Sequence, residues 1–154
     1  MNIALIAHDS KKKLMQNFCI AYRGILSKHE LYATGTTGLL IEEVTNLRIH
    51  KFLPGETGGA RQLASQIEQG NLDMVIFLRD PLHVKAQEPE VNSIVRLCDS
   101  YNIPIATNLA TAELLIKALY GFTVRSMRDQ GIKDYDRRST DTCLDRIERI
   151  AIVA

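Results

Sequence analysis

The sequence predicts an α/β fold: a three-layer α/β/α sandwich around a five-stranded, mainly parallel sheet. Short apolar runs alternate along the chain with segments in which apolar residues recur at helical spacing, the pattern of repeated strand and helix units. The strongest run, residues 72–78 (LDMVIFL), is apolar on both faces, which is typical of a strand covered by helices on either side. The length of 154 residues fits one domain with a substantial core.

The first half of the chain holds three of the predicted strands, at residues 2–8, 30–34 and 48–52. A helix is expected after the first strand from the spacing of Leu14, Phe18, Ala21, Tyr22 and Ile25. A second, shorter helix follows Gly38, with an apolar face expected from Leu39, Leu40, Ile41 and Val44.

The second half begins with a glycine-rich turn, LPGETGGARQLA at 53–64, that runs into a helix carrying Leu63, Ala64 and Ile67 and closing at Gly70. After the strand at 72–78, a helix is expected from Val91, Ile94, Val95, Leu97 and Cys98. The strand at 103–107 and a helix over Ala112, Leu114, Leu115 and Ala118 complete the pattern. Beyond about Leu119 the pattern weakens to a possible edge strand at 122–124, a charged turn, and a helix or strand.

Composition excludes several classes of function. Nineteen basic and eighteen acidic residues leave a formal charge of +1, and no charge run exceeds Lys11 to Lys13, which argues against a nucleic-acid or membrane-surface partner. No apolar stretch approaches the roughly 20 residues of a membrane span, and the first residues reverse the order of a secretory signal. Cys19, Cys98 and Cys143 form no C-x-x-C pair and are expected to be reduced, buried thiols of a cytoplasmic protein.

Ligands of such folds bind beyond the carboxyl ends of the strands, where four loops are expected to meet. The first contains His8, Asp9 and Lys12, and its alternative interpretation is a capping aspartate beside a surface imidazole. The second, Thr34 to Gly38 (TGTTG), offers backbone N–H groups and hydroxyls at a helix start, which suits an anion. It matches neither the nucleoside triphosphate nor the dinucleotide motif.

The third and fourth loops extend the same edge. Gly55, Gly58 and Gly59 precede a helix, where three glycines in five residues indicate either ligand contact or a turn. Asp80 follows the most buried strand and either faces the ligand or caps the next segment. Because all four loops are expected on one edge, the sequence predicts a site for a small phosphorylated ligand.

Four motifs resemble methylglyoxal synthase in order and spacing: IALIAHD with Lys12, LYATGTTG, FLRDPL and IPIATNLATAE, covering about residues 2–118. The resemblance implies one methylglyoxal synthase-like domain over residues 1–154, with a tail that diverges from about 119. It also implies a homohexamer that needs no metal or organic cofactor. The implied reaction converts dihydroxyacetone phosphate to methylglyoxal and inorganic phosphate by proton abstraction from carbon and elimination of phosphate.

The resemblance also assigns roles to individual residues. His8, Asp9 and Asp80 correspond to polar residues lining the reaction site, and Glu90 to a further carboxylate there. Five positions correspond to those that hold the phosphate: Lys12, Thr34, Thr36, Thr37 and Gly55. Four further candidates for phosphate contact come from the loops themselves and not from the resemblance: Gly35, Gly58, Gly59 and Arg61.

The resemblance fails at the proposed proton-abstracting base. The family has Gly-Gly-Asp-Gln in the glycine loop, whereas this chain has Ala60 and Arg61 after its two glycines. A methyl group cannot accept a proton, and a guanidinium with a pKa above about 12 cannot act as a base. After the DPL motif, Gln87 replaces a histidine and Glu90 replaces an aspartate.

Three hypotheses remain open from the sequence. The first is a working lyase of impaired activity, in which Asp9 or Asp80 becomes the base and Glu90 and His83 assist, unless His83 is only an exposed loop residue. The second is a catalytically silent module that binds or senses a small phosphorylated ligand. In such a module Arg61 contacts the phosphate. The alternative is that Arg61 is a solvated residue at a helix start. The third is an enzyme with a different substrate.

Overall fold

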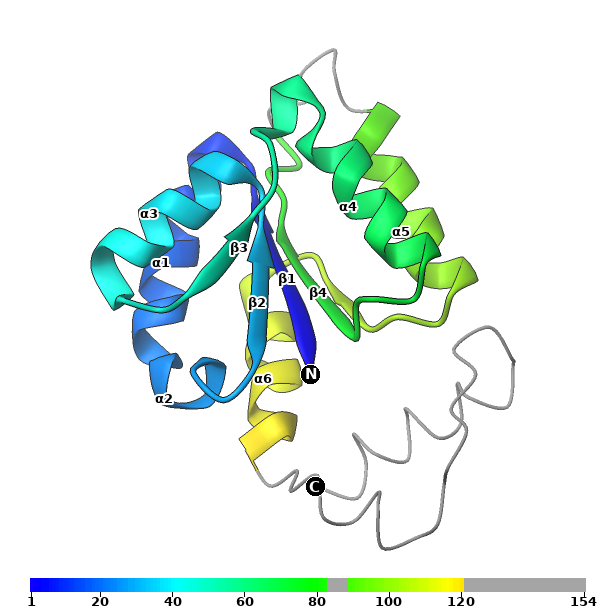
Figure 1. Cartoon of the computed structure of the whole chain (residues 1–154). Helices are drawn as coiled ribbons and strands as arrows, with labels where there is room; N and C mark the ends of the chain where they lie inside the picture. The colour runs from blue at the N-terminus through cyan, green and yellow to red at the C-terminus, as the bar shows by residue number, and fades with distance from the viewer. Residues whose placement is uncertain (83–88, 121–154) are drawn as a thin grey trace, which may run out of the picture.

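The computed structural model describes residues 1–82 and 89–120, and within these ranges five strands form one sheet (Figure 1). The strands are β1 (Asn2–Ala7), β2 (Glu30–Ala33), β3 (Ile49–Lys51), β4 (Met74–Leu78) and β5 (Ile105–Ala106). Their order is β3-β2-β1-β4-β5, and every neighbouring pair is parallel. Each strand lies within one of the five ranges expected from the sequence, so the prediction is confirmed.

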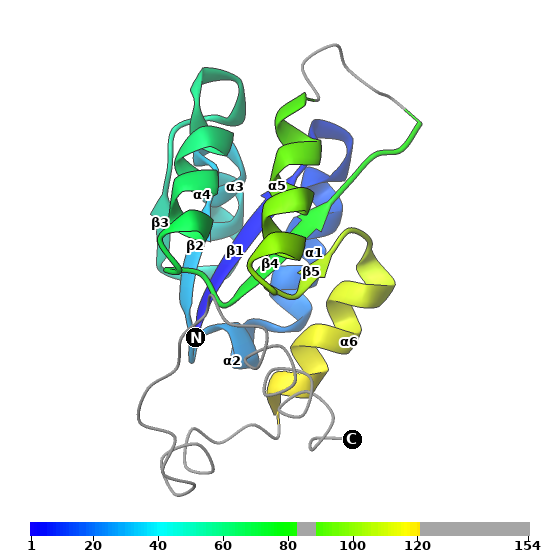
Figure 2. The same cartoon turned by 90° about the vertical axis from the view of Figure 1, so that its right-hand side faces the viewer.

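Helices cover both faces of this sheet (Figures 1 and 2). One face carries α1 (Lys12–Ala21), α2 (Arg23–Leu26), α3 (Gly35–Thr45) and α6 (Leu109–Tyr120). The other carries α4 (Gly59–Glu68) and α5 (Pro89–Ser100), which pack against each other. Two short 3-10 turns, η1 (Asp9–Lys11) and η2 (Gly55–Thr57), precede α1 and α4. The predicted three-layer α/β/α arrangement is confirmed.

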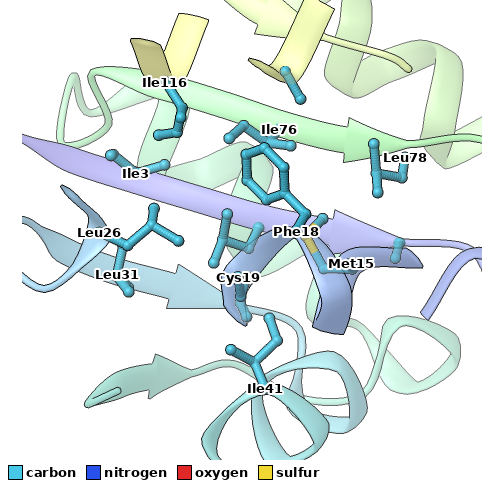
Figure 3. Close-up of a cluster of buried hydrophobic side chains, with 14 of the residues drawn as sticks. Ile3, Met15, Phe18, Cys19, Leu26, Leu31, Ile41, Ile76, Leu78 and Ile116 are labelled. Carbon is cyan, nitrogen blue, oxygen red and sulfur yellow. The ribbon is translucent and has the colours of Figure 1, made fainter. Parts of the chain in front are cut away.

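The two cores follow from the alternation of side chains along the strands, since successive residues point to opposite faces. Ile3 and Leu5 of β1 join Ile76 of β4 in one core, shown in Figure 3 with Phe18 of α1 and other side chains from the helices. The residues between them pack on the opposite face, in a core made by Ala4, Ile6, Val75, Phe77, Leu63, Ile67, Ile94 and Cys98. Every residue of β4 is buried, as its apolar sequence predicts.

Helix α3 buries only part of the expected face. Ile41 is buried as expected, but Leu39 and Val44 are 59% and 38% exposed, and Thr37 and Gly38 are buried in their place. The reason is steric: a Cβ on Gly38 would lie 2.7 Å from the side chain of Lys51, so the small-residue face alone fits against the sheet. In α6 the expected core residue Leu114 is 71% exposed, while Ala112, Ile116 and Leu119 are buried.

The strand order creates a topological switch point between β1 and β4. From β1 the chain moves outward through β2 to β3, then returns to the other side of β1 to form β4 and β5. The loops that leave adjacent strands in opposite directions open a crevice at such a point, and ligands of open α/β sheets bind there. The loops after β1 and β4 hold His8 and Asp80, respectively.

Several predictions fall outside the described residues: the tail after Tyr120, the edge strand at 122–124, and the loop residues His83 and Gln87. Across the part of the chain that is described, no helix has the length and apolar character needed to span a membrane.

Candidate active site

His8 and Asp80 meet at the switch point. The backbone N–H of Asp80 donates a hydrogen bond of 2.9 Å to Nδ1 of His8, and the N–H of His8 donates one of 3.1 Å to the carbonyl oxygen of Leu78. The imidazole also packs edge-on against Phe77, with ring centroids 5.3 Å apart. Because Nδ1 accepts a hydrogen bond, the neutral ring carries its proton on Nε2 and can donate that proton's hydrogen bond to another group.

The Asp80 carboxylate is held on both oxygens. Its Oδ2 accepts a hydrogen bond of 2.5 Å from the hydroxyl of Ser10, and its Oδ1 accepts one of 3.0 Å from the backbone N–H of Leu82. Asp80 is only 7% exposed, so these hydrogen bonds offset part of the cost of burying a carboxylate. The interpretation of Asp80 as a residue that stabilises the next segment is supported by the bond to Leu82, and its side chain also contacts the loop after β1. That Asp80 faces a ligand stays a prediction.

Asp9 and Lys12 form an ion pair in the loop after β1. The Nζ atom of Lys12 lies 2.6 Å from Oδ1 of Asp9, with side-chain exposures of 21% and 62%, respectively. Asp9 is the first residue of η1 and is not the N-cap residue of η1 or α1, so the predicted capping role is wrong. An exposed ion pair of this kind contributes little to stability, which leaves the ammonium able to exchange its partner for a bound anion.

The second predicted loop forms the start of α3. Thr34 is the extended N-cap residue, and its hydroxyl donates a hydrogen bond of 3.3 Å to Oγ1 of Thr37. The N–H of Gly35 is bound to the carbonyl oxygen of Leu53, so the N–H groups of Thr36 and Thr37 are the donors of the first turn that lack an intrahelical acceptor. Thr34 and Thr37 are 7% and 2% exposed, while Thr36 is exposed. This arrangement suits an anion.

The glycine loop packs directly against the start of α3. A Cβ on Gly35 would lie 2.9 Å from the carbonyl oxygen of Phe52, so only glycine allows this approach. Gly58 has a φ of 110°, and a Cβ on Gly59 would lie 1.9 Å from the carbonyl oxygen of Leu53. The interpretation of these two glycines as a turn is therefore correct. Around Gly55, in contrast, no atom lies within 4 Å of such a Cβ, which leaves room beside its backbone.

Ala60 and Arg61 occupy the first turn of α4. Ala60 is half-buried and, together with Tyr32 and Phe52, packs against the apolar core on that face of the sheet. Arg61 is exposed and makes no ion pair with any residue of 1–82 or 89–120. The N–H of Gln62 already reaches the carbonyl oxygen of Gly58, so the N–H groups of Ala60 and Arg61 have no intrahelical acceptor.

Two residues that support the site were not singled out from the sequence. Ser10 contacts Asp80, and the side-chain oxygen of Gln62 accepts a hydrogen bond of 2.7 Å from the N–H of Leu53, which fixes the glycine loop to α4. The position of Ser10 directly after His8 and Asp9 was the available signal. Glu90 lies in the first turn of α5. Within the described ranges, no group of three or more His, Cys, Asp or Glu residues is arranged to hold a metal ion.

Comparisons with known proteins agree with this arrangement. The family described as the MGS-like domain matches residues 16–107. A methylglyoxal synthase from Caldicellulosiruptor saccharolyticus is 66% identical over 119 residues, which are 77% of this chain and 84% of that protein. One from Listeria welshimeri is 56% identical over 119 residues, 77% of this chain and 89% of that protein.

A solved structure is also similar. The crystal structure of a methylglyoxal synthase from Elizabethkingia anophelis matches with a TM-score of 0.71 and 41% sequence identity, covering 75% of this chain and 76% of that one. The enzyme named in these relatives is a lyase. On fold, sequence and loop arrangement together, the chain belongs to the methylglyoxal synthase family.

Proposed function

We propose that the protein is a lyase that converts dihydroxyacetone phosphate to methylglyoxal and inorganic phosphate. The observation that supports this most is the contact between the loops after β1 and β4 at the switch point. There a buried carboxylate, Asp80, lies beside an imidazole that can donate from Nε2, His8. Family membership indicates a phosphorylated substrate, and the start of α3, which suits an anion, supports that class.

The substrate phosphate is held by the N–H groups and hydroxyls at the start of α3, with Lys12 adding a positive charge. Binding the phosphate draws Lys12 away from Asp9 and fixes the position of the reacting carbons. Glycine at position 55 lets the phosphate approach the backbone closely. These contacts set affinity during proton abstraction, and they also stabilise the charge that grows on the phosphate as the carbon–oxygen bond breaks.

Asp80 is the better candidate for the base that removes the proton from the hydroxymethyl carbon. Its carboxylate is buried and held on both oxygens, whereas that of Asp9 is 62% exposed and paired with Lys12. A fixed carboxylate has less orientation to lose on reaching the transition state. As the proton leaves, His8 Nε2–H donates to the carbonyl oxygen and stabilises the enediolate.

Elimination completes the reaction. The proton on the hydroxyl of the former hydroxymethyl carbon leaves, and the enediolate oxygen takes one up. The deprotonated oxygen forms an aldehyde carbonyl, the carbon–carbon double bond shifts to the neighbouring carbon pair, and the carbon–oxygen bond to phosphate breaks, which leaves the enol of methylglyoxal. The enol takes up a proton at its methylene carbon, loses the proton of its hydroxyl and becomes methylglyoxal. The overall conversion is neutral in electrons, so no redox partner is required.

We expect impaired activity, because position 60 carries a methyl group and position 87 an amide. Loss of a general base typically costs about 10² to 10⁴-fold in rate. Asp80 reaches the substrate from the loop after β4 and not from the start of α4, so it only partly replaces the missing carboxylate. Glu90 retains a charge on a longer side chain and assists from the start of α5.

The second candidate function is a catalytically silent module that binds or senses a small phosphorylated ligand. It is favoured by the start of α4, where Ala60 packs against an apolar core and offers no proton acceptor. The exposed Arg61 beside it adds charge that would suit a ligand more anionic than a simple phosphate ester. A third candidate, the same chemistry on a different phosphorylated carbonyl compound, shares all these contacts.

Assembly and location are proposed on other grounds. A homohexamer is proposed from the family resemblance alone. A cytoplasmic location is proposed because Cys19 and Cys98 are free thiols buried in the two cores, which suits a reducing compartment.

The test compares the purified protein with Asp80→Asn and Asp9→Asn on dihydroxyacetone phosphate, following methylglyoxal and phosphate together. The lyase predicts both products in equal amounts, a fall of about 10²-fold or more in Asp80→Asn, and a smaller fall in Asp9→Asn. If the unaltered protein gives no product but still binds phosphate in calorimetry, the lyase is excluded and the silent module remains. Product from another phosphorylated carbonyl compound alone would favour the third candidate.

A further inference from the structure

We propose that Ser10 is a positioning residue that holds the Asp80 carboxylate in the orientation needed for proton abstraction. The inference rests on the proposed function, and it assigns a role to a residue outside the set expected from the sequence. It starts from one contact: the Ser10 hydroxyl donates a hydrogen bond of 2.5 Å to Oδ2 of Asp80, across 70 residues of sequence.

Two features of the fold place Ser10 over this carboxylate. β1 and β4 are paired in register up to Ala7 and Leu78, and the pairing continues past the strand ends because the N–H of His8 binds the carbonyl oxygen of Leu78. Beyond this point the chain turns back in η1, closed by a hydrogen bond of 2.8 Å from the N–H of Lys11 to the carbonyl oxygen of His8. The turn brings the Ser10 side chain to the loop after β4.

The Ser10 contact adds to two other hydrogen bonds that hold Asp80. The backbone N–H of Asp80 is anchored on His8, Oδ1 accepts from Leu82 N–H, and Oδ2 accepts from Ser10. Without the hydroxyl, Oδ2 loses this donor, which weakens the hold on the orientation of the carboxylate. A rotated carboxylate no longer presents the same lone pair to the substrate.

The hydroxyl has two opposing effects on a base, and their magnitudes decide the outcome. Donating a hydrogen bond to the charged carboxylate lowers its basicity, which slows proton transfer. Losing the orientation is costlier, since a misplacement of about 1 Å can reduce the rate on the order of 10²-fold. Orientation therefore dominates, and removing the hydroxyl slows the reaction.

Ser10 is suited to a direct test because it lies outside both cores and is exposed. Ser10→Ala removes the hydroxyl, and Ser10→Thr keeps it. Ser65→Ala is the matched control: it removes a hydroxyl at a half-buried position on α4 that accepts a hydrogen bond from Gln69.

The kinetic experiment measures kcat and KM for dihydroxyacetone phosphate in the unaltered protein and the three variants. Ser10→Ala is expected to lose about tenfold in kcat, the loss typical of one hydrogen bond to a charged group, with KM within about twofold. Ser10→Thr and Ser65→Ala are expected to match the unaltered protein. An unchanged kcat in Ser10→Ala, or an equal fall in Ser10→Thr, would overturn the proposal.

A second readout does not depend on catalysis. Carbon-13 NMR of protein labelled at aspartate follows the titration of the Asp80 carboxyl. The charged and titratable groups of the neighbouring loops, His8, Asp9, Lys12 and Arg79, are the same in every variant. Ser10→Ala should move the titration midpoint to higher pH, and Ser10→Thr should restore it, because the donor stabilises the charged form. Identical titration midpoints in the unaltered protein and Ser10→Ala would show that Ser10 does not hold the Asp80 carboxylate. If the unaltered protein makes no methylglyoxal, the proposed lyase function fails, and the titration still decides whether Ser10 holds Asp80.

Discussion

The backbone N–H of Asp80 donates to Nδ1 of His8 at 2.9 Å, and this one contact decides which nitrogen of the neutral imidazole carries the proton. Because an acceptor nitrogen cannot carry the proton, the neutral ring presents Nε2–H. The loop after β4 thereby sets the chemistry of the loop after β1. A donor of this kind suits a developing enediolate oxygen better than an acceptor would.

The first prediction is that nitrogen-15 NMR of His8 at neutral pH shows the Nε2–H tautomer. His8→Gln keeps a donor near the Nε2 position and should lose less activity than His8→Asn, which keeps an acceptor near Nδ1 only. Removing a donor to a developing oxyanion typically costs about 10² to 10³-fold in kcat. A proton found on Nδ1, or equal losses in the two variants, would show that the ring acts in another way.

The second prediction concerns the glycine loop. Gly59→Ala should lower the free energy of unfolding by about 1–3 kcal/mol, measured with urea, because the new Cβ would lie 1.9 Å from the Leu53 carbonyl oxygen and the backbone must move. Gly55→Ala, with no atom within 4 Å of its Cβ, is the control and should stay within about 0.5 kcal/mol. Equal stabilities for the two variants would contradict this account of the loop.

The strands and their order illustrate what the sequence can and cannot predict. β1 and β4 were predictable because each is a short apolar run bounded by polar or glycine-rich segments. β2 (ELYA) and β3 (IHK) carry polar residues, and the alternation of strands with helices indicated them instead. The strands that pair with β1 were not predictable, since no residue of β1 indicates which strands lie beside it. The position of Ser10 after His8 and Asp9 placed it near the site, but its contact with Asp80 depends on the strand order and could not be predicted from the sequence.

The buried face of α3 shows a second limit. Leu39 and Val44 were expected in the core on hydrophobicity, yet Thr37 and Gly38 are buried in their place. The close approach of this helix to Lys51 and the Phe52 carbonyl favours small side chains over apolar ones. Threonine and glycine in TGTTG therefore meet the packing requirement of this helix, and the same residue types suit the anion site proposed there.

The third prediction concerns Cys19. Burial raises the pKa of its thiol from 9.0 to about 12, so at pH 8 almost no thiolate forms in the folded protein. In a Cys143→Ser variant, Ellman's reagent should therefore leave Cys19 unlabelled until guanidinium unfolds the chain. Because the folded pKa is raised, the thiol's contribution to stability is complete below pH 9 and is lost as the pH rises towards 12. Rapid labelling of Cys19 in the native protein would contradict this assignment.

The fourth prediction concerns the ion pair between Glu42 and Lys51, which joins α3 to β3. The hydrogen bond from Lys51, and then that from the backbone N–H of Ile49, lower the pKa of Glu42 from 4.5. A lowered carboxyl pKa contributes stability above pH 4.5, and this contribution is lost as the pH falls through the folded pKa. Glu42→Gln should therefore lower Tm by a few degrees at pH 7 and progressively less below pH 4.5.

Glu43→Gln serves as the control for this pair, because it removes the same charge from an exposed neighbouring position. Its Tm should follow that of the unaltered protein across the pH range. A difference between Glu42→Gln and the unaltered protein that stays constant from pH 7 to pH 4 would show that the carboxylate's charge is not the source of the stabilisation.

The central claim is that proton abstraction survives the loss of the carboxylate at position 60. The most direct measurement compares methylglyoxal formation by the unaltered protein with that by Ala60→Asp and by a variant that adds Arg61→Gln, Gln87→His and Glu90→Asp. We predict slow but measurable turnover by the unaltered protein, and a rate about 10²-fold or more higher in the restored variants. Product from the restored variant, with none from the unaltered protein, would contradict it and identify the native protein as a phosphate-ligand binder on an enzyme fold.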